Sequence, residues 1–405
     1  MKTRLFKMFA FILVFIGLNA TAQTRYIDNV FDSVTVTSDV VYGQNVTILP
    51  MLQQQPPAVA PLLCDIYEPK NDTLTDRPVI ILMHTGSFLP AVLNGQATGS
   101  KSDNSVVENC MRWAKKGYVA VAMSYRQGWN PTSPSQAVRT ATILQAAYRG
   151  IQDVKAAIRF LRMDYENGNT YGIDTSRIII CGQGTGGWIA TCLNSVDKLS
   201  ELQLPKFLDT NAVPLIDTSV LGDWFGYGGD TNYNTENHKG YSSDHDMVLN
   251  MGGAIGDLSW LEAGDKPIAA VHGNLDAIAR FTTGNLSVSG INIVSSISGS
   301  HDVVTKANML GNNDAIPNLF DDYTLAAKAA SNSIVGTLDF SGDTVGPSAD
   351  NLFPFVTGNP GEGAPWEFFD STMCIQLAVG QGLPASVGTD AYMSSLATNP
   401  NVSVA

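Results

Sequence analysis

Residues 177–187 read Arg-Ile-Ile-Ile-Cys-Gly-Gln-Gly-Thr-Gly-Gly, an apolar run followed at once by small residues. The run Arg177–Cys181 predicts a buried strand, because apolar residues without alternation suit a strand that is covered on both faces. The alternating glycines that follow predict a tight turn. A helix is expected over Gly187–Ser195. The segment therefore predicts a strand–turn–helix unit, as found in parallel α/β sheets.

Further patterns along the chain extend this unit into a sheet. Pro78–Met83 and Tyr118–Tyr125 are continuous apolar runs, as expected of buried central strands. Ala137–Tyr165 repeats apolar residues at three- and four-residue steps, which predicts a long helix with one face on the sheet. Other strands are expected at Val34–Val41, Leu62–Tyr67, Met247–Met251, Pro267–Val271 and Ile291–Ile297, and shorter helices at Val106–Lys116 and Tyr323–Ile334. This alternation predicts an α/β fold, with a mostly parallel central sheet and helices on both faces.

The turn after Cys181 carries a catalytic pattern with one residue changed. Residues 182–186 match the nucleophile elbow G-x-S-x-G at both outer glycines, but the central residue is Gly184. A glycine tolerates the strained backbone of an elbow, yet it has no hydroxyl to form an acyl-enzyme. Loss of a triad nucleophile lowers turnover by on the order of 10⁶-fold. A plain glycine-rich turn and a phosphate site stay open as alternatives, although the spacing fits no nucleotide-binding motif.

Several other segments, in order, resemble the α/β-hydrolase fold of carboxylesterases and feruloyl-esterase-like proteins. The resemblance covers roughly residues 60–310. It is carried by the strand Leu63–Pro69, the loop His84–Phe88 in the place of an HGG-type oxyanion loop, Ser124-Tyr125-Arg126, the helical segment Gln152–Ala157, the HG-x-x-D segment His272–Asp276, and Gly299-Ser300-His301. It implies a hydrolase without cofactor or metal. The ligand that it implies is a small-molecule or polysaccharide-linked carboxylic ester.

The resemblance also implies site residues. The family's chain order is nucleophile, acid, histidine, and positions 184, 276 and 301 keep that order. Asp276 would hold the imidazole of His301, which would take the proton from a nucleophile. The oxyanion hole would be formed by the backbone N–H groups of Thr85, Gly86, Ser87 and Thr185. Thr85 departs from the glycine that is usual in this loop.

The missing serine leaves three hypotheses for function. The preferred one is a pseudoenzyme that binds an ester, a sugar or a protein in the old pocket without covalent turnover. The second is hydrolysis by a water molecule that His301 activates in the space left by the side chain. The third is a non-catalytic partner-binding protein on the hydrolase scaffold. In that case the aromatic group Trp224, Phe225 and Tyr227 would form an interface, or else the lining of a lid.

The N-terminus predicts a signal peptide. Basic residues precede the apolar run Met8–Leu18, and Ala20-Thr21-Ala22 fits a small-x-small cleavage site. We therefore expect residues 1–22 to be removed and the mature chain, starting at Gln23, to be secreted or periplasmic. The apolar run is short for a membrane span, and no later run is long enough.

Composition narrows the possible partners. The net charge is −13 and no cluster of Lys and Arg occurs, which argues against a nucleic-acid partner. The five cysteines show no C-x-x-C spacing, so no zinc or redox site is expected. Cys64 and Cys181 fall within predicted strands, where buried, inert thiols are the preferred interpretation.

One domain is expected over residues 23–340, followed by a Gly/Pro-rich tail at 341–405 that packs back through its aromatic residues. A polar insertion at 199–246 is expected over the carboxyl edge of the sheet, where such folds carry lids. Oxygen-bearing residues alternate within it at Asp230, Asn232, Asn234 and Glu236. That spacing could suit calcium, but the loop lacks the glycine and distal glutamate of an EF-hand, so a solvated polar loop is preferred.

Overall fold

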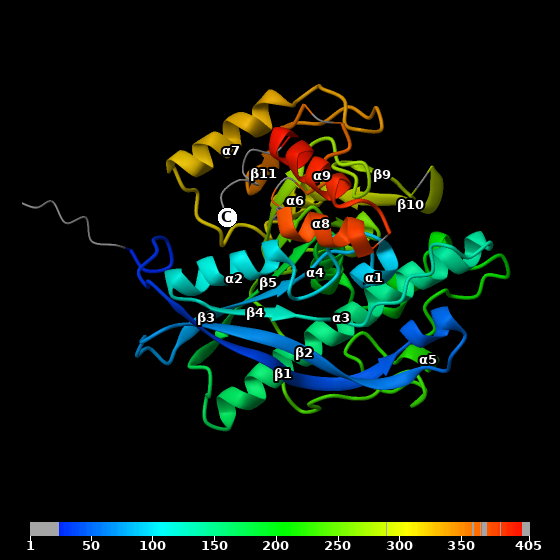
Figure 1. Cartoon of the computed structure of the whole chain (residues 1–405), viewed down its shortest axis with the longest axis horizontal. Helices are drawn as coiled ribbons and strands as arrows, with labels where there is room; N and C mark the ends of the chain where they lie inside the picture. The colour runs from blue at the N-terminus through cyan, green and yellow to red at the C-terminus, as the bar shows by residue number, and fades with distance from the viewer. Residues whose placement is uncertain are drawn as a thin grey trace, which may run out of the picture.

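The centre of the molecule is an eight-stranded sheet, seen in Figure 1 with helices on either side. The computed structural model describes residues 24–288, 290–358, 360–364, 366, 371–380 and 382–398. The expected signal peptide, residues 1–22, lies outside these described residues. The strand order is β1-β2-β4-β3-β5-β6-β8-β11. These strands are β1 Val34–Thr47, β2 Ala58–Pro69, β3 Arg77–Met83, β4 Val119–Met123, β5 Ile173–Gln183, β6 Met247–Met251, β8 Ile268–Gly273 and β11 Leu352–Phe355.

Strand direction gives the sheet its class. β2 runs antiparallel to both β1 and β4, whereas every pair from β4 to β11 is parallel. β3 and β4 are buried along their whole length, as their apolar runs predict. This mostly parallel sheet, with β5 turning sharply into a helix, confirms the expected α/β-hydrolase fold.

Two hydrophobic clusters cover opposite faces of the sheet. Successive residues of β3 point to opposite sides, so Ile81 belongs to one cluster and Leu82 to the other. The first cluster includes apolar residues of the helices α3 (Gln136–Glu166) and α4 (Thr185–Ser195). The second includes those of α2 (Asn104–Lys116). The core is therefore a sheet between two helical layers, as the alternation of elements predicts.

The predicted strand Ile291–Ile297 exists, but it does not join the central sheet. Strand β10, Ile291–Gly299, pairs antiparallel with β9 (Thr283–Val288) and with β7 (Ala254–Ile255) in a separate three-stranded sheet. Its residues alternate between exposed and buried pairs, unlike the fully buried central strands. Such a strand suits a sheet with one face in water.

The place beside β8 is taken by β11, from the region predicted to be the tail. Leu352 of β11 pairs in parallel with Ala270 of β8. The sheet therefore continues past residue 340, which corrects the expected domain boundary. β11 has only four residues and includes a proline, which is tolerated at a sheet edge.

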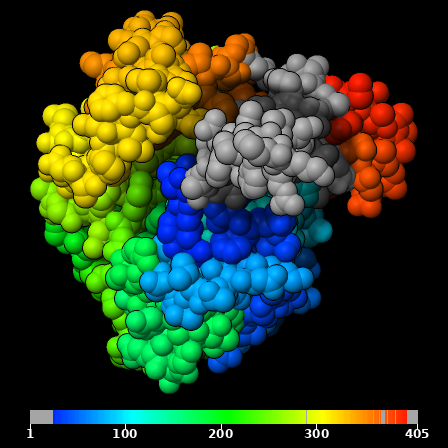
Figure 2. All heavy atoms as spheres, turned by 90° about the vertical axis from the view of Figure 1, so that its left-hand side faces the viewer, coloured from blue at the N-terminus to red at the C-terminus, as the bar shows by residue number. Residues whose placement is uncertain are grey.

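The C-terminal helices lie at one end of the molecule. These are α7 (Asp322–Ser333), α8 (Ser371–Gly380) and α9 (Ala385–Thr398), at the opposite end in Figure 1 from β1 and β2. Figure 2 shows the orange and red residues of this region protruding from the upper part of the molecule. Among the described residues, no helix is both long and apolar enough to cross a membrane.

The polar insertion packs against α3 and β1. Asn45 Nδ2 of β1 donates to Asn234 Oδ1 over 3.1 Å, and Arg159 Nε of α3 donates to the Asn237 carbonyl over 2.9 Å. Leu202 and Ile216 of the insertion line one of the two cavities described below. Its buried asparagines therefore fix much of the insertion to the N-terminal strand, and its placement as a lid stays a prediction.

Candidate functional site

Gly184 forms the turn between β5 and α4. Its backbone has φ +52° and ψ −113°, a conformation that side-chain-bearing residues rarely adopt. Its N–H donates to the Met251 carbonyl of β6 over 2.8 Å, and its own carbonyl accepts from Trp188 N–H over 3.0 Å. The turn is therefore held from both sides, by the neighbouring strand and by the first turn of α4.

The outer glycines of the turn are required by close packing. A Cβ at Gly182 would lie 2.1 Å from the Gly186 carbonyl carbon, and one at Gly186 would lie 2.4 Å from the Met83 carbonyl oxygen. Real Cβ atoms essentially never approach other atoms so closely. The glycine spacing read from the sequence thus reflects the contact between β5, α4 and the end of β3.

The loop after β3 lies directly beside the turn. Gly86, Ser87 and Phe88 have φ values of +115°, +55° and +54°, so two side-chain-bearing residues adopt left-handed conformations there. Strain of this kind tends to be kept at functional sites. Thr85 Oγ1 accepts a long hydrogen bond, 3.4 Å, from the backbone N–H of Thr185. The structure therefore brings together the four residues that were expected to form an oxyanion hole.

Tyr125 ties this loop to the turn. Its hydroxyl donates to the His84 carbonyl over 2.9 Å and lies 3.0 Å from Thr185 Oγ1. Its ring stacks on the His84 imidazole, with centroids 4.4 Å apart. Burial lowers the pKa of His84 to about 4, so this imidazole is neutral at physiological pH. His84 is thus a packed part of the loop.

Asp276 follows the carboxyl end of β8 and is buried. Its Oδ1 accepts from Ile278 N–H over 2.7 Å and from Ala279 N–H over 2.9 Å. Its Oδ2 lies 3.3 Å from His272 Nε2. The carboxylate therefore shapes the loop after β8, and its imidazole neighbour is His272.

His272 continues this contact into a buried chain of polar groups. Its Nδ1 lies 2.6 Å from Ser300 Oγ, which accepts from Asn250 Nδ2 over 3.0 Å. Its Nε2 donates to the Ala279 carbonyl over 2.9 Å. His272 and Ser300 are both fully buried, so this chain is closed to ligands.

His301 lies apart from Asp276. It is the second residue of α6 (Ser300–Met309), with Nδ1 2.7 Å from Asp302 Oδ1 and Nε2 2.9 Å from the Pro347 carbonyl oxygen. The structure therefore does not form the expected pair of His301 and Asp276. Both ring nitrogens have partners, and one of them comes from the tail segment, which the resemblance did not cover.

Two adjoining cavities meet at the turn. The first, which we name the polar cavity, has a volume of about 410 Å³ and holds both Gly184 and Asp276 in its wall. Its lining residues are Thr85, Ser87, Gln96–Thr98, Gly184, Thr185, Trp188, Gly252, Asp276, Ile278, Ala279 and Gly361–Ala364. His301 is not among them. Glu362 and its glycine neighbours, which sequence reasoning missed, enter the wall because β11 brings the tail to this edge.

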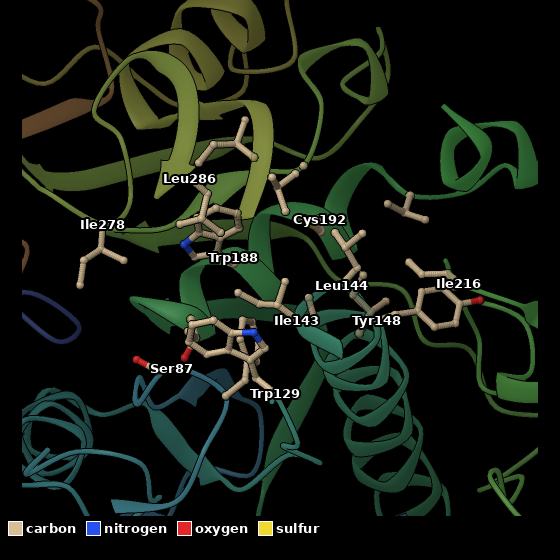
Figure 3. A pocket seen from close by; sticks show the side chains of 18 of the residues that line it. Ser87, Trp129, Ile143, Leu144, Tyr148, Trp188, Cys192, Ile216, Ile278 and Leu286 are labelled. Atoms are coloured by element: carbon tan, nitrogen blue, oxygen red, sulfur yellow. The ribbon is translucent and has the colours of Figure 1, made fainter. Parts of the chain in front are cut away.

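The second cavity, which we name the apolar chamber, has a volume of about 140 Å³. Figure 3 shows Trp188 and Leu286 across the chamber from Trp129 and Ser87. The wall is built by α3, α4, the insertion and the β9–β10 hairpin, with these main residues: Trp129, Ile143, Leu144, Tyr148, Trp188, Cys192, Ile216, Trp260, Leu286 and Val294. Ser87, Thr185 and Trp188 line both cavities. Sequence reasoning missed the chamber, although the alternating apolar residues of the hairpin were a signal.

Two further expectations concern metals and thiols. Within the described part of the chain, no three His, Cys, Asp or Glu residues are grouped closely enough to hold a metal ion. Four cysteines are buried, and burial raises the pKa of Cys64 and Cys192 to about 12. A thiol with so high a pKa is not a nucleophile at neutral pH.

The fold and the turn place the chain among α/β-hydrolases of the esterase-like kind. More specifically, the chain belongs to the BD-FAE family, whose model matches residues 64–288, more than half of its length. No curated protein matches it.

Solved structures give distant likenesses. A bifunctional GH43-CE protein of Bacteroides eggerthii is 17% identical, with a TM-score of 0.36, and the match covers 60% of this chain and 29% of that one. A truncated carbohydrate esterase from gut microbiota is 18% identical, with a TM-score of 0.35, covering 64% and 82%. The propionate-bound esterase Est2 of Thermogutta terrifontis is 18% identical, with a TM-score of 0.35, covering 62% and 75%. Likenesses this distant decide nothing about activity.

Proposed function

We propose that this chain is a secreted, esterase-like hydrolase homologue that binds a carboxylic-ester ligand but is impaired in covalent turnover. The observation that carries the proposal is Gly184. It has the conformation of an elbow residue, lies between β5 and α4, faces the polar cavity and has no side chain to attack a carbonyl. Membership of the BD-FAE family supports the esterase-like part.

The two cavities suit an ester. Ligand sites are typically apolar with a few polar groups that orient the ligand. Here the polar groups of Thr85, Ser87 and Thr185 would face the ester carbonyl, and the apolar chamber would hold its acyl or alcohol part. A small-molecule ester and a polysaccharide-linked ester both fit this division. Export after removal of residues 1–22 remains part of the proposal.

The test compares turnover in the parent chain and in a variant that regains a hydroxyl at position 184. We expect the parent chain to hydrolyse chromogenic acyl esters near the background rate. Because a Cβ at 184 would meet Thr85 at 2.1 Å, the serine is introduced as the double variant Thr85→Gly/Gly184→Ser, with Thr85→Gly as its control. Because the described lining of the polar cavity includes no histidine to activate a serine, we expect slow covalent labelling of the double variant by a fluorophosphonate and none of the parent chain.

Three results would contradict parts of this proposal. Burst kinetics in the parent chain would show that a nucleophile is present. Turnover that His301→Ala abolishes would support the water that His301 activates, even though both ring nitrogens of His301 have other partners in the structure. Absence of ester binding together with capture of a macromolecular partner through the insertion would favour the scaffold hypothesis.

A further inference from the structure

Thr85 and Gly184 occupy complementary space. A Cβ built on Gly184 would lie 2.1 Å from Thr85 Oγ1 and 2.9 Å from Thr85 Cβ. The space in which a nucleophile side chain would begin is therefore already filled from the neighbouring loop. Thr85 is also the position at which this loop departs from the glycine expected of an HGG-type sequence.

Rotation of the Thr85 side chain does not remove the conflict. The contact with Thr85 Cβ is independent of the χ1 angle, since Cβ does not move when χ1 changes. The other staggered rotamers put the methyl group or the Cβ hydrogen in place of the hydroxyl, and the 2.9 Å contact with Thr85 Cβ remains in each of them. A side chain at 184 and a threonine at 85 are thus incompatible unless the backbone shifts.

The Thr85 hydroxyl also covers one of the donors expected to hold an oxyanion. It accepts a long hydrogen bond of 3.4 Å from Thr185 N–H, so a ligand oxygen would have to compete with Thr85 for that donor. A hydroxyl has one proton to donate as well as two lone pairs to accept. Among the contacts of the described residues, Thr85 Oγ1 is bonded to Thr185 N–H alone, which leaves its proton available to the polar cavity.

Charge on the cavity wall limits which ligands can accept a hydrogen bond from the Thr85 hydroxyl. The polar cavity is lined by Asp276 and Glu362, and its described lining includes no Lys, Arg or His. An anionic ligand would be repelled by two carboxylates. A neutral carbonyl would accept a hydrogen bond from the Thr85 hydroxyl without that repulsion.

The geometry points to Thr85 as the residue that replaces the lost nucleophile side chain, closing the covalent site and offering its hydroxyl to a neutral carbonyl ligand. This inference rests on the proposed function, because it takes position 184 as the place of the nucleophile. It makes Thr85 a ligand-positioning residue and couples the residues at positions 85 and 184.

The steric half is tested by a thermal-unfolding cycle of the parent chain, Gly184→Ala, Thr85→Gly and the double variant. An alanine at 184 is strained at φ +52° whether residue 85 is threonine or glycine, so it lowers the melting temperature in both cases. The steric clash occurs only when residue 85 is threonine. We expect Gly184→Ala to lower Tm by roughly 5 °C more beside Thr85 than beside glycine. Thr85→Ser/Gly184→Ala, which retains the hydroxyl and Cβ, should keep most of that extra loss. Equal losses in the two backgrounds would overturn the steric half.

The ligand half is tested by measuring how tightly a ketone isostere of 4-nitrophenyl butyrate binds. Binding is detected as quenching of tryptophan fluorescence, because Trp188 lines both cavities. Thr85→Val keeps the shape and removes the hydroxyl, and we expect its dissociation constant to rise roughly fivefold. Thr85→Ser should bind within about twofold of the parent chain. Unchanged affinity in Thr85→Val, or tighter binding of butyrate than of the ketone, would overturn the ligand half. If the parent chain does not bind the ketone, the proposed function fails, while the unfolding cycle still decides the steric half.

Discussion

At position 184 the backbone adopts φ +52° and ψ −113°, and glycine is the residue that adopts it with the least strain. The Met251 carbonyl and the first turn of α4 hold this turn in place through the backbone alone. The sequence predicted that Gly184 lies in a tight turn between a strand and a helix, with glycines on either side. It could not predict that Thr85 fills the space above Gly184, because that contact joins residues about 100 positions apart.

The pair of His301 and Asp302 predicts a pH dependence of stability. Burial lowers the pKa of His301, but the hydrogen bonds to Asp302 and the Pro347 carbonyl outweigh burial and leave this pKa raised. Burial raises the pKa of Asp302, but hydrogen bonds from His301 and Thr283 leave it lowered. A raised histidine pKa stabilises the fold fully below the unfolded value of 6.5, and this is lost as pH rises through the folded value. The carboxylate contribution is present above 3.8 and is lost as pH falls through its folded pKa.

We therefore expect His301→Gln to lower Tm more at about pH 5.5 than at about pH 8.5, since the stabilisation from the raised pKa of His301 is complete at the lower pH and is lost as pH rises. Differential scanning fluorimetry of both chains at the two pH values measures this. His238→Gln serves as a control, because its Nε2 contacts the neutral carbonyl of Tyr42. A larger loss at the higher pH would contradict the assignment of charge to this pair.

At the scale of the elements, the strands near β8 show that a local sequence pattern does not determine which strands pair. Ile291–Gly299 has strand character, as predicted, but it pairs with β9 and β7. β11, with four residues and Pro354, has little strand signal of its own, yet it completes the central sheet beside β8. Pairing partners depend on which edge is free in the folded chain, and no local window of sequence contains that information.

Because β11 belongs to the central sheet, we expect the segment after residue 340 to be needed for folding. Val345, Ala349 and Leu352 are buried against Phe281 and Val304 in one cluster. Each large apolar side chain that is buried contributes about 1.5–3 kcal/mol. We expect a chain truncated after residue 340 to lose its cooperative unfolding transition, as measured by circular dichroism. A chain truncated after residue 366, which keeps β11, should retain this transition, and equal behaviour of the two chains would contradict the role of the strand.

For the whole molecule, the main finding is that distant segments meet around one turn. The apolar chamber takes its wall from α3, α4, the insertion and the β9–β10 hairpin, and the polar cavity takes part of its wall from the tail. The insertion contributes little to these walls because its asparagines bond to β1 and its backbone carbonyls to α3. The size of the apolar chamber is therefore set jointly by the hairpin and by the long helix.

Filling the chamber should separate ligands by size. Ile216 lines the chamber, and we expect Ile216→Trp to raise the dissociation constant of a ketone probe with a six-carbon acyl chain roughly tenfold. A probe with a two-carbon chain should be unaffected, because it would reach only the polar cavity. Leu199→Trp is the matched control, since Leu199 lies in the same insertion but is 46% exposed. Both dissociation constants are measured by calorimetry, because the variants change the number of tryptophans. Equal weakening of both probes would contradict the prediction that the chamber holds the end of the acyl chain.

The sequence by itself determined the strands of the core sheet other than β11, the glycine-rich turn after β5 and the absence of a side chain at 184, because burial, periodicity and backbone freedom are properties of short segments. Only the tertiary structure decided which histidine lies beside Asp276, which strand borders β8 and what fills the space above Gly184. These depend on contacts between segments far apart in the chain. The packing of the whole core and the available hydrogen-bond partners determine these contacts. His301, for example, contacts the Pro347 carbonyl of the tail and not Asp276.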